Sequence, residues 1–493
     1  MTGRPARGHE ARWPCQENAP PVKFPGRALA ALLVILIASL AGAYVLERGR
    51  AARGADTSMT TSSRNGVASL ELPDIFAQGP ALDQRLLNAS FLKVRSVYYK
   101  PVDDAALLTG ERAGLAAWLH AHGVTDPVLP DAAATGDATQ DQQTLDAVLQ
   151  GAIGRYGKRF SDTVLMQQAI KGMLAGLKDP YTTYLTPDEI SQLEESLNGG
   201  DFGGIGVYIV QDPRTGLVLV QPIEGTPAAR AGIKTGDSII AVDGKPTKGE
   251  TLDTVEREIR GRTGTVVRLL VRSQGERSPH TVAVVRERIH VPSVHAKVEG
   301  NIGYIRLSDF GSTSYEEVRH AVDSTRRGGA KAFILDLRNN GGGLLDAAVD
   351  ISSIWIKQGT IVSTVDRPGD REVHQATGQY DLAEPLVVLV NKYTASASEI
   401  TAGAIQDDHA GTVLGTRTFG KGVVQSIYRL PDLSALKITT ARYLTPSGRD
   451  IDHKGIEPDI VVDQSVDPAL IDTPNDRQLA AAKALLERDL ASR

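Results

Sequence analysis

The sequence predicts an α/β core with a parallel or mixed sheet, an inserted β-rich domain, an N-terminal helical region and one N-terminal transmembrane helix. Strand-like and helix-like runs alternate after Val291, which is typical of an α/β core. Residues 199–290 instead alternate short β runs with glycine-centred turns. Residues 28–46 (ALAALLVILIASLAGAYVL) form a run of nineteen residues without a charge, a length that can just span a bilayer.

Length, net charge and cysteine content limit the classes of protein to which the chain can belong. A chain of 493 residues is long enough for roughly two or three domains with substantial cores. The formal net charge is −5 and no basic face is apparent, so no nucleic-acid partner is expected. Cys15 is the only cysteine, so the chain can form neither an intrachain disulfide nor a thiolate metal cluster.

The apolar run at residues 28–46 is interpreted as a signal anchor that follows a cytoplasmic segment at residues 1–27. A buried helix of a soluble domain is the alternative, which a uniform apolar run so near the N-terminus disfavours. Ala41-Gly42-Ala43 resembles a small-residue cleavage site, so a cleaved signal stays open, although the long preceding segment favours an anchor. Basic residues lie on both sides of the run, so charge alone does not decide its orientation.

Two regions with different sequence patterns follow the apolar run. Residues 47–84 are polar, small and aperiodic, as expected of a flexible linker. Helical spacing then dominates residues 85–198, with a break rich in Pro, Gly and Asp at residues 123–142. Thr186 as N-cap and Pro187 at the first helical position predict the start of the last helix in this region.

The β-rich domain at residues 199–290 contains the loop Gly204-Ile205-Gly206-Val207 and, further on, PAARAGIKTGDSIIAVDG. Together these stretches resemble a PDZ domain, the module that binds peptides. The resemblance implies that backbone N–H groups of the loop capture a C-terminal carboxylate while the peptide adds a strand beside it. The alternative is an ordinary β-rich domain whose glycines only make turns.

The α/β core is expected at residues 291–465, followed by a C-terminal helical tail at residues 466–493. KAFILDLR (331–338) and PLVVLV (385–390) are predicted as buried strands, and each precedes a turn of small residues and a helix. Ligands bind at the carboxyl ends of strands in open α/β sheets, so both turns should meet in one cleft. Turns at helix N-termini present unpaired N–H groups that suit a developing oxyanion.

Ser396 lies at the second of these turns, and Lys421 follows 25 residues later at the head of the strand-like run VVQSIYRL. This arrangement suggests a nucleophile and its base. Ser396-x-x-Glu399 is also a capping box, so the hydroxyl could simply cap the helix. Ser398 and Thr394 are further hydroxyl residues, and local chemistry does not choose among them.

Lys421 has alternatives of its own. GTRTFGK (415–421) matches the first seven positions of a phosphate-binding P-loop, but Gly422 stands where that motif needs Ser or Thr, and a strand follows instead of a helix. A solvated surface lysine is the usual case, although the flanking glycines let other backbone approach closely. Lys421 and Gln425 would face the same way in a strand. Burial among apolar groups can make a lysine neutral near pH ~7, so that it accepts a proton.

Several stretches resemble the carboxyl-terminal processing, or tail-specific, proteases. TASASEITAGAIQD (394–407) and GTRTFGKGVVQ (415–425) carry the resemblance most sharply. The match extends over residues 85–465 and includes the PDZ-like block. Its other motifs are KDPYTTYL (178–185), LDLRNNGGG (335–343) and YLTPSGRDIDHKGIEPDI (443–460).

The resemblance implies a role for each matching residue. Ser396 would be the nucleophile and Lys421 the general base, and Gln425 would orient the lysine. The spacing of 25 residues to Lys421 selects Ser396 rather than Ser398. The backbone N–H groups of Gly342 and Ala397 would form the oxyanion hole. Gly341 departs from the family pattern, because members often have proline before the two glycines.

The resemblance further implies a serine endopeptidase that cleaves envelope or secreted proteins near their C-termini, with no metal or cofactor. The PDZ-like domain would hold substrate tails and gate activity. The catalytic part would lie in the bacterial periplasm or outside the cell, held at the inner membrane by one helix. An adaptor protein and a homo-oligomer are further partners that the sequence allows.

Two other interpretations remain at this point. A catalytically silent PDZ scaffold on the membrane is one alternative, which the complete set of Ser396, Lys421 and Gln425 disfavours. A Ser-His-Asp triad is the other, because the chain has ten histidines. Those in the core region include His295, His320, His374, His409 and His453.

Overall fold

The computed structural model describes residues 82–198, 202–212, 215–273, 275–379, 382–464, 467 and 470–492. The predicted anchor at residues 28–46, and the linker as far as residue 81, lie outside this part of the chain. Among the described residues, no helix combines the length and the hydropathy that crossing a bilayer requires.

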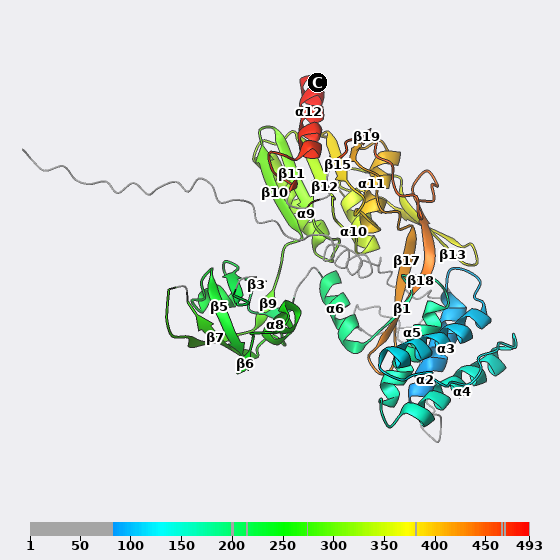
Figure 1. The fold of residues 1–493 in the computed structure, drawn as a ribbon. Coiled ribbons are helices and arrows are strands. Elements are labelled where there is room, and N and C mark those ends of the chain that lie inside the picture. Colours follow the sequence, from blue (N-terminus) through cyan, green and yellow to red (C-terminus); the bar gives the residue numbers. More distant parts are fainter. Residues whose placement is uncertain are drawn as a thin grey trace, which may run out of the picture.

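The N-terminal helical region begins at Leu82 and is built from helices that pack side by side (Figure 1). Glycines bring two of the helices into close contact: a β-carbon at Gly114 would lie 2.4 Å from the Cα of Gly172. Thr186 and Pro187 begin the last helix with a complete capping box, as predicted. The elements are α2 (Leu82–Val97), α3 (Asp104–Ala121), α4 (Ala138–Tyr156), α5 (Asp162–Ala175), β1 (Thr183–Leu185) and α6 (Pro187–Leu197).

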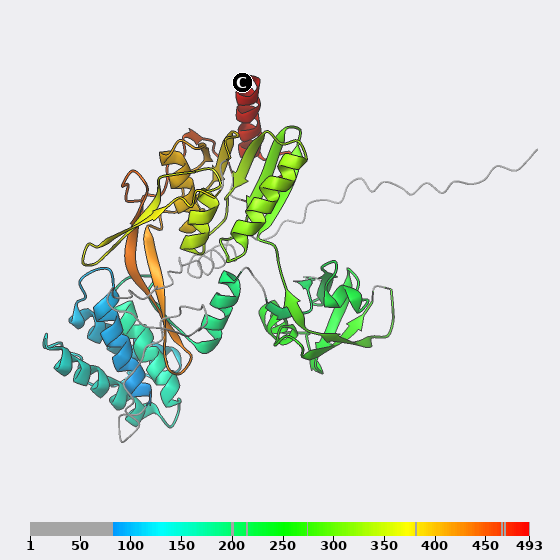
Figure 2. The same ribbon diagram turned by 180° about the vertical axis from the view of Figure 1, so that it is seen from behind.

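The β-rich domain is an antiparallel sheet in the order β3-β4-β5-β7-β8, with β6 paired to β5 and a separate β2-β9 ribbon. Its core forms where the buried side of the sheet meets the apolar face of α8. In both views the domain lies to one side of the core, next to α6 (Figures 1 and 2). Its elements are β2 (Phe202–Gly204), β3 (Val207–Gln211), β4 (Val218–Pro222), α7 (Pro227–Arg230), β5 (Asp237–Val242), β6 (Lys245–Pro246), α8 (Leu252–Ile259), β7 (Val266–Arg272), β8 (His280–Val285) and β9 (Glu287–Ile289).

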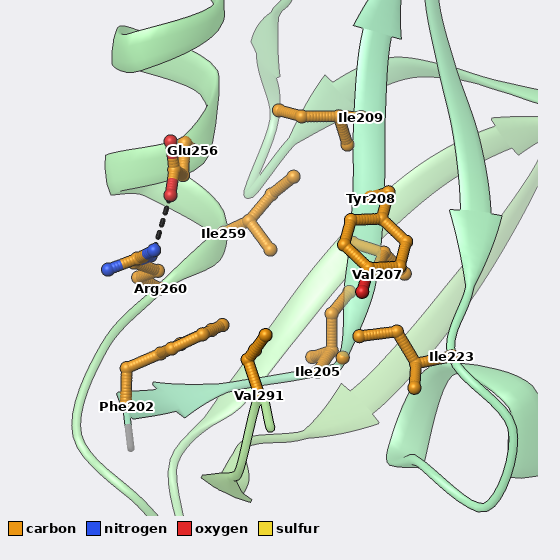
Figure 3. Close-up of a pocket in the computed structure, with 11 residues that line it drawn as sticks. Phe202, Ile205, Val207, Tyr208, Ile209, Ile223, Glu256, Ile259, Arg260 and Val291 are labelled. Carbon is orange, nitrogen blue, oxygen red and sulfur yellow. Dashed lines mark ion pairs between the residues drawn. The ribbon is translucent and has the colours of Figure 1, made fainter. Parts of the chain in front are cut away.

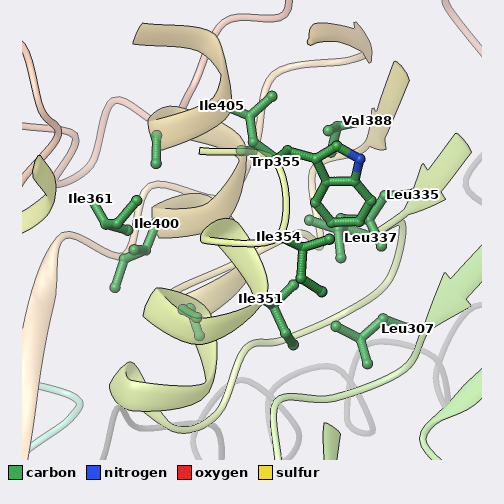
Figure 4. Close-up of a cluster of buried hydrophobic side chains, with 14 of the residues drawn as sticks. Leu307, Leu335, Leu337, Ile351, Ile354, Trp355, Ile361, Val388, Ile400 and Ile405 are labelled. Carbon is green, nitrogen blue, oxygen red and sulfur yellow. The ribbon is translucent and has the colours of Figure 1, made fainter. Parts of the chain in front are cut away.

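The α/β core is a six-stranded mixed sheet in the order β10-β11-β12-β15-β16-β19, parallel except for the β10-β11 pair. Successive side chains of its central strands serve opposite faces: Leu335 and Val388 pack under α9, α10 and α11 (Figure 4), whereas Ile334 packs against α12. The elements are β10 (Val294–Glu299), β11 (Ile302–Leu307), α9 (Ser314–Arg327), β12 (Ala332–Asp336), α10 (Leu345–Ser352), β15 (Leu386–Val390), α11 (Ala397–Asp407), β16 (Thr412–Gly415), β19 (Ile460–Val461) and α12 (Arg477–Ser492).

A buried ion network fastens the segment before α12 to the end of β12. The Arg338 guanidinium donates to Asp336 Oδ2 at 2.6 Å and to Asp476 Oδ1 at 2.7 Å. All three side chains are almost completely buried. A buried guanidinium needs such paired carboxylates, because one left without a partner would carry the full cost of its lost hydration. The network therefore secures the strand end that leads into the turn at residues 339–343.

A second, antiparallel sheet joins the core to the helical region. Its order is β1-β18-β13-β14, and β17 pairs with β18. The long strand β18 pairs with β17 on one edge and with β1 of the helical region on the other. The hairpin of β13 and β14 is an element that the sequence analysis did not predict. The bounds are β13 (Thr360–Asp366), β14 (Arg371–Gln375), β17 (Val423–Arg429) and β18 (Ala435–Leu444).

Candidate active site

Ser396 occupies a strained turn between β15 and α11. Its φ of 56° and ψ of −119° place a non-glycine residue at positive φ, a conformation that costs free energy and concentrates at functional sites. Its side chain is fully buried, and Ser396 Oγ has no hydrogen-bond partner among the described residues. The N–H of Glu399 donates to the Ser396 carbonyl oxygen at 2.8 Å, so this N–H has an acceptor other than the Ser396 hydroxyl. A buried hydroxyl without a partner requires an explanation, and a catalytic role is one such explanation.

Lys421 lies just before β17 and is 1% exposed. The glycines beside it admit the backbone of residues 452–455: a β-carbon at Gly422 would lie 2.6 Å from Asp452 N, and one at Gly420 would lie 2.9 Å from Gly455 N. Burial lowers the pKa of Lys421 to about 7, and the positive charge of Lys437 adds to this effect. A substantial fraction of the amine is therefore neutral at physiological pH.

Glu399 joins the turn of Ser396 to the turn of Lys421. Its Oε2 accepts the backbone N–H of Ser396 and that of Lys421, both at 2.9 Å. Its Oε1 accepts the N–H of Gly420 at 2.7 Å and the hydroxyl of Thr418 at 2.5 Å. Burial raises the pKa of this carboxyl, and the four hydrogen bonds oppose that rise. One buried side chain thus fixes the relative position of both backbones.

Tyr443 contacts the backbone carbonyl groups of Ser396 and Lys421. Its buried hydroxyl lies within hydrogen-bonding distance of the carbonyl oxygen of Lys421 and 3.2 Å from that of Ser396. Tyr443 belongs to β18, so the central strand of the second sheet takes part in holding the site.

Gly342 packs directly against the Ser396 turn. At its φ of +100°, a β-carbon would lie 2.8 Å from both Ser396 Cβ and Ala397 N, so only glycine fits. Its N–H, the predicted oxyanion donor, donates to Asn340 Oδ1 at 2.8 Å. Ala397, the other predicted donor, is the first residue of α11. The two predicted residues are adjacent, and the N–H of Gly342 is engaged with Asn340 in this conformation.

Gln425 is buried in β17, two residues beyond the strand start at Val423. Its Nε2 lies 3.4 Å from the Val423 carbonyl oxygen, and its Oε1 has no hydrogen-bond partner among the described residues. The hydrogen bond by which Gln425 would orient the lysine amine is therefore not made here.

Two residues near the lysine escaped the sequence analysis. Lys437 is buried in β18, where burial lowers its pKa to about 8. Tyr181 places its ring under Lys421, with the Nζ 4.8 Å from the ring centroid. Tyr181 lay within a motif already noted, but Lys437 gave no local signal, because its strand reads as an ordinary amphipathic run.

The other candidate chemistries find no support in the described part of the chain. No described histidine is hydrogen-bonded to Ser396 Oγ, as a Ser-His-Asp triad would require. Among the same residues, no cluster of three or more His, Cys, Asp or Glu side chains is arranged to hold a metal ion.

The predicted peptide loop borders a groove between β3 and α8 (Figure 3). Ile205, Gly206 and Val207 line a cavity of about 260 Å³, whereas Gly204 ends strand β2 outside the lining. The positive φ of Gly206, +74°, and the 2.4 Å that would separate a β-carbon there from Thr226 Cβ explain the glycine. The apolar side chains of the groove include Phe202, Ile205, Val207, Ile209, Ile223 and Ile259.

The groove also touches the helical region. Arg260, at the end of α8, pairs with Glu256 at 2.5 Å within the domain and with Glu195 of α6 at 3.0 Å. Figure 3 shows Arg260 and Glu256 at the rim of the cavity, beside the ring of Phe202.

Comparison with known proteins identifies relatives of this chain. The model of peptidase family S41 matches residues 301–462, and a PDZ domain model matches residues 218–273. The carboxyl-terminal-processing protease of Synechocystis sp. is 42% identical over 330 residues, which cover 66% of this chain and 77% of that protein. The carboxy-terminal-processing protease of Bartonella bacilliformis is 40% identical over 309 residues, covering 62% and 70% respectively. The solved photosystem II D1 C-terminal processing protease is 29% identical, with a TM-score of 0.46, covering 81% of this chain and 100% of the other.

Proposed function

This chain belongs to the carboxyl-terminal-processing serine proteases with a PDZ domain, and on that premise we propose that it cleaves peptide bonds through a dyad of Ser396 and Lys421. The observation that carries the proposal is that one side chain, Glu399, binds the backbones of both Ser396 and Lys421. Glu399 accepts the backbone N–H of both residues at 2.9 Å, which connects a buried amine to a buried hydroxyl that has no hydrogen-bond partner among the described residues. Burial also brings the pKa of Lys421 to about 7, which suits a general base at neutral pH.

The proposed reaction follows from these roles. Neutral Lys421 accepts the proton of Ser396, and the serine oxygen attacks the scissile carbonyl carbon. Backbone N–H groups of Gly342 and Ala397 stabilise the oxyanion, the leaving amine takes the proton from Lys421, and an acyl-enzyme forms. Water then attacks the acyl carbon with Lys421 again as base, which releases the new C-terminus and restores the serine.

Two local adjustments prepare the site for this reaction. The N–H of Gly342 exchanges Asn340 Oδ1 for the substrate oxygen, and Gln425 Oε1 becomes an acceptor for the Lys421 amine. The first adjustment exchanges a hydrogen-bond partner and the second adds one, both within a preformed backbone. Catalytic hydrogen bonds often tighten only when substrate is bound.

The PDZ domain supplies the substrate preference in this proposal. A protein tail would add a strand beside β3, with its terminal carboxylate at the loop of Ile205, Gly206 and Val207 and its side chains in the apolar groove. Occupancy of the groove would gate the protease core. Replacing the carboxylate of a peptide by an amide should therefore weaken both binding and cleavage.

The decisive experiment is peptide cleavage by single variants. Ser396→Ala and Lys421→Ala are expected to abolish turnover of an internally quenched peptide while the thermal unfolding midpoint stays near that of the parent. Ser324→Ala and Lys331→Ala, which remove exposed side chains of the same types, serve as matched controls. Turnover by Lys421→Ala at the parental rate would refute the dyad. Tail binding by a parent protein that never cleaves would favour the scaffold instead.

The same proposal includes a location. The uncharged run at residues 28–46 would anchor the chain in the bacterial inner membrane, with the catalytic part in the periplasm or outside the cell. Trypsin added to intact spheroplasts should then degrade the protease core. Protection of the core until the membrane is lysed would contradict this topology.

A further inference from the structure

The motif KDPYTTYL lies against the proposed catalytic lysine. It follows α5 and leads into β1, and the first of its two tyrosines, Tyr181, turns a ring face toward Lys421. The Nζ of Lys421 lies 4.8 Å from the centroid of that ring. This is contact distance for a cation on an aromatic face.

The ring is held in place by the turn that precedes it. Asp179 accepts the N–H of Tyr181 at 2.9 Å and the hydroxyl of Thr182 at 2.7 Å. Thr182 Oγ1 in turn accepts the N–H of Thr439 in β18 at 3.0 Å. The tyrosine is therefore fixed to the strand that pairs with β17, whose first residues follow Lys421.

A buried base needs a partner for the charge that it acquires. In the proposed mechanism, Lys421 becomes an ammonium group each time it takes a proton from Ser396 or from water. It is buried, and burial penalises its charged form. An aromatic face attracts a cation without adding a formal charge, and the attraction grows when water is excluded.

We propose that Tyr181 is a positioning residue of the protease, whose ring face holds the Lys421 ammonium during the proton-transfer steps. The proposal rests on the Ser396–Lys421 dyad proposed above, and it gives a role to a motif that the dyad alone leaves unexplained. The ring stabilises the protonated lysine relative to the neutral one. Its removal should therefore make Lys421 release its proton at a lower pH.

Other charged groups act on the same amine from the surrounding elements. Lys437 of β18 opposes its protonation, whereas Glu399 of α11 and Asp179 of the tyrosine's own turn favour it. Substitution of Tyr181 by a neutral residue leaves all three charges in place. Burial raises the pKa of Tyr181 to about 12, so the phenol itself is neutral throughout the working range. A shift in the pH profile would thus report on the ring.

The test is the pH dependence of kcat/KM, measured with the full chain and an internally quenched peptide that ends in a free carboxylate. In Tyr181→Leu and Tyr181→Met, the acid limb should move to lower pH by about 0.5–1.5 units. Tyr181→Phe keeps the ring and should restore the limb to its parental position. Tyr99→Leu is the matched control, because Tyr99 carries a comparable lysine contact, with Lys100 Nζ 4.7 Å from its ring centroid.

The outcomes separate this proposal from the dyad itself. The role of the ring would be refuted if the acid limb of kcat/KM did not move in Tyr181→Leu and Tyr181→Met. It would also be refuted if the limb moved equally in Tyr181→Phe. In both cases Lys421→Ala would remain inactive. An active Lys421→Ala protein would refute the dyad, and with it the basis for this inference. Thermal unfolding of each variant shows which proteins are folded. If Tyr181→Leu does not fold, the comparison of Tyr181→Met with Tyr181→Phe still tests the role of the ring.

Discussion

The carboxylate of Glu399 accepts the backbone N–H of Lys421 at 2.9 Å, although 22 positions separate the two residues in the chain. The same oxygen accepts the N–H of Ser396, so the proposed nucleophile and the proposed base are hydrogen-bonded through their backbones to one oxygen atom. The relation between the two turns therefore depends on a residue that itself takes no part in bond making.

Glu399→Gln should lower kcat more than it raises KM. The amide replaces one acceptor oxygen with an N–H₂ group, which leaves a buried N–H donor unsatisfied at a cost of about 1–3 kcal/mol. If that cost falls on the geometry of the dyad, kcat should drop by roughly 10- to 100-fold. Steady-state kinetics of Glu399→Gln measures the effect. Glu372→Gln, at an exposed position of β14, is the control. Equal kcat values for the two variants would contradict it.

Lys437→Met should move the acid limb of kcat/KM to higher pH, opposite to the change expected at Tyr181. Lys437 lowers the pKa of Lys421 by charge repulsion, so removing its charge raises that pKa and leaves less neutral base at pH 7. Lys437→Arg retains the charge and is the control. A limb that moves to lower pH in the methionine variant would show that repulsion between these lysines does not set the profile.

Gly206→Ala should weaken tail binding far more than Gly225→Ala. Both glycines have positive φ, +74° and +76°, so the backbone strain is similar. Only at position 206 would a β-carbon meet other atoms, at 2.4 Å from Thr226 Cβ. Fluorescence anisotropy with a labelled peptide should show at least about a tenfold loss of affinity, equivalent to about 1.4 kcal/mol. Similar affinities would mean that the loop does not contact the peptide.

Glu111→Gln should stabilise the protein at neutral and alkaline pH. Glu111 is buried in α3, neither carboxyl oxygen has a hydrogen-bond partner among the described residues, and burial raises its pKa well above the usual value. Because the folded pKa is raised, the stability it supports is present in acid and is lost as pH rises through the folded pKa. The variant should therefore gain about 1–3 kcal/mol in unfolding free energy near pH 8 and nothing near pH 4.

Denaturant unfolding at both pH values measures this gain. Glu487→Gln, at an exposed position of α12, provides the control without a pH-dependent difference. A constant gain for Glu111→Gln across the pH range would point to packing and not to ionisation.

Much of the core was predictable because its strands are buried on both faces. The runs around Leu335 and Val388 are continuously apolar, which parallel strands covered by helices require. The hairpin of β13 and β14 was missed even though a Pro-Gly-Asp turn separates its two β-rich runs. The transmembrane anchor at residues 28–46 stays a prediction, because those residues lie outside the described chain.

The sequence offered candidate residues for the site but not their hydrogen bonds. The turn and the flanking glycines suggested Ser396 and Lys421, but only the spacing in the family resemblance selected Ser396 rather than Ser398. The engagement of Gly342 with Asn340 could not be predicted, because it depends on how the loop folds back on itself. Lys437 could not be identified either: its burial arises where β18 pairs with β1 of the helical region, a contact between segments about 250 positions apart.

The pairing of Arg338 with Asp476 has a consequence for how the enzyme is made. Ribosomes deliver the chain in order, so the arginine emerges 138 residues before its second carboxylate. Until that carboxylate has been synthesised, Arg338 has only the carboxylate of Asp336 in this network. The turn at residues 339–343 therefore gains the full support of this network only after synthesis has passed residue 476.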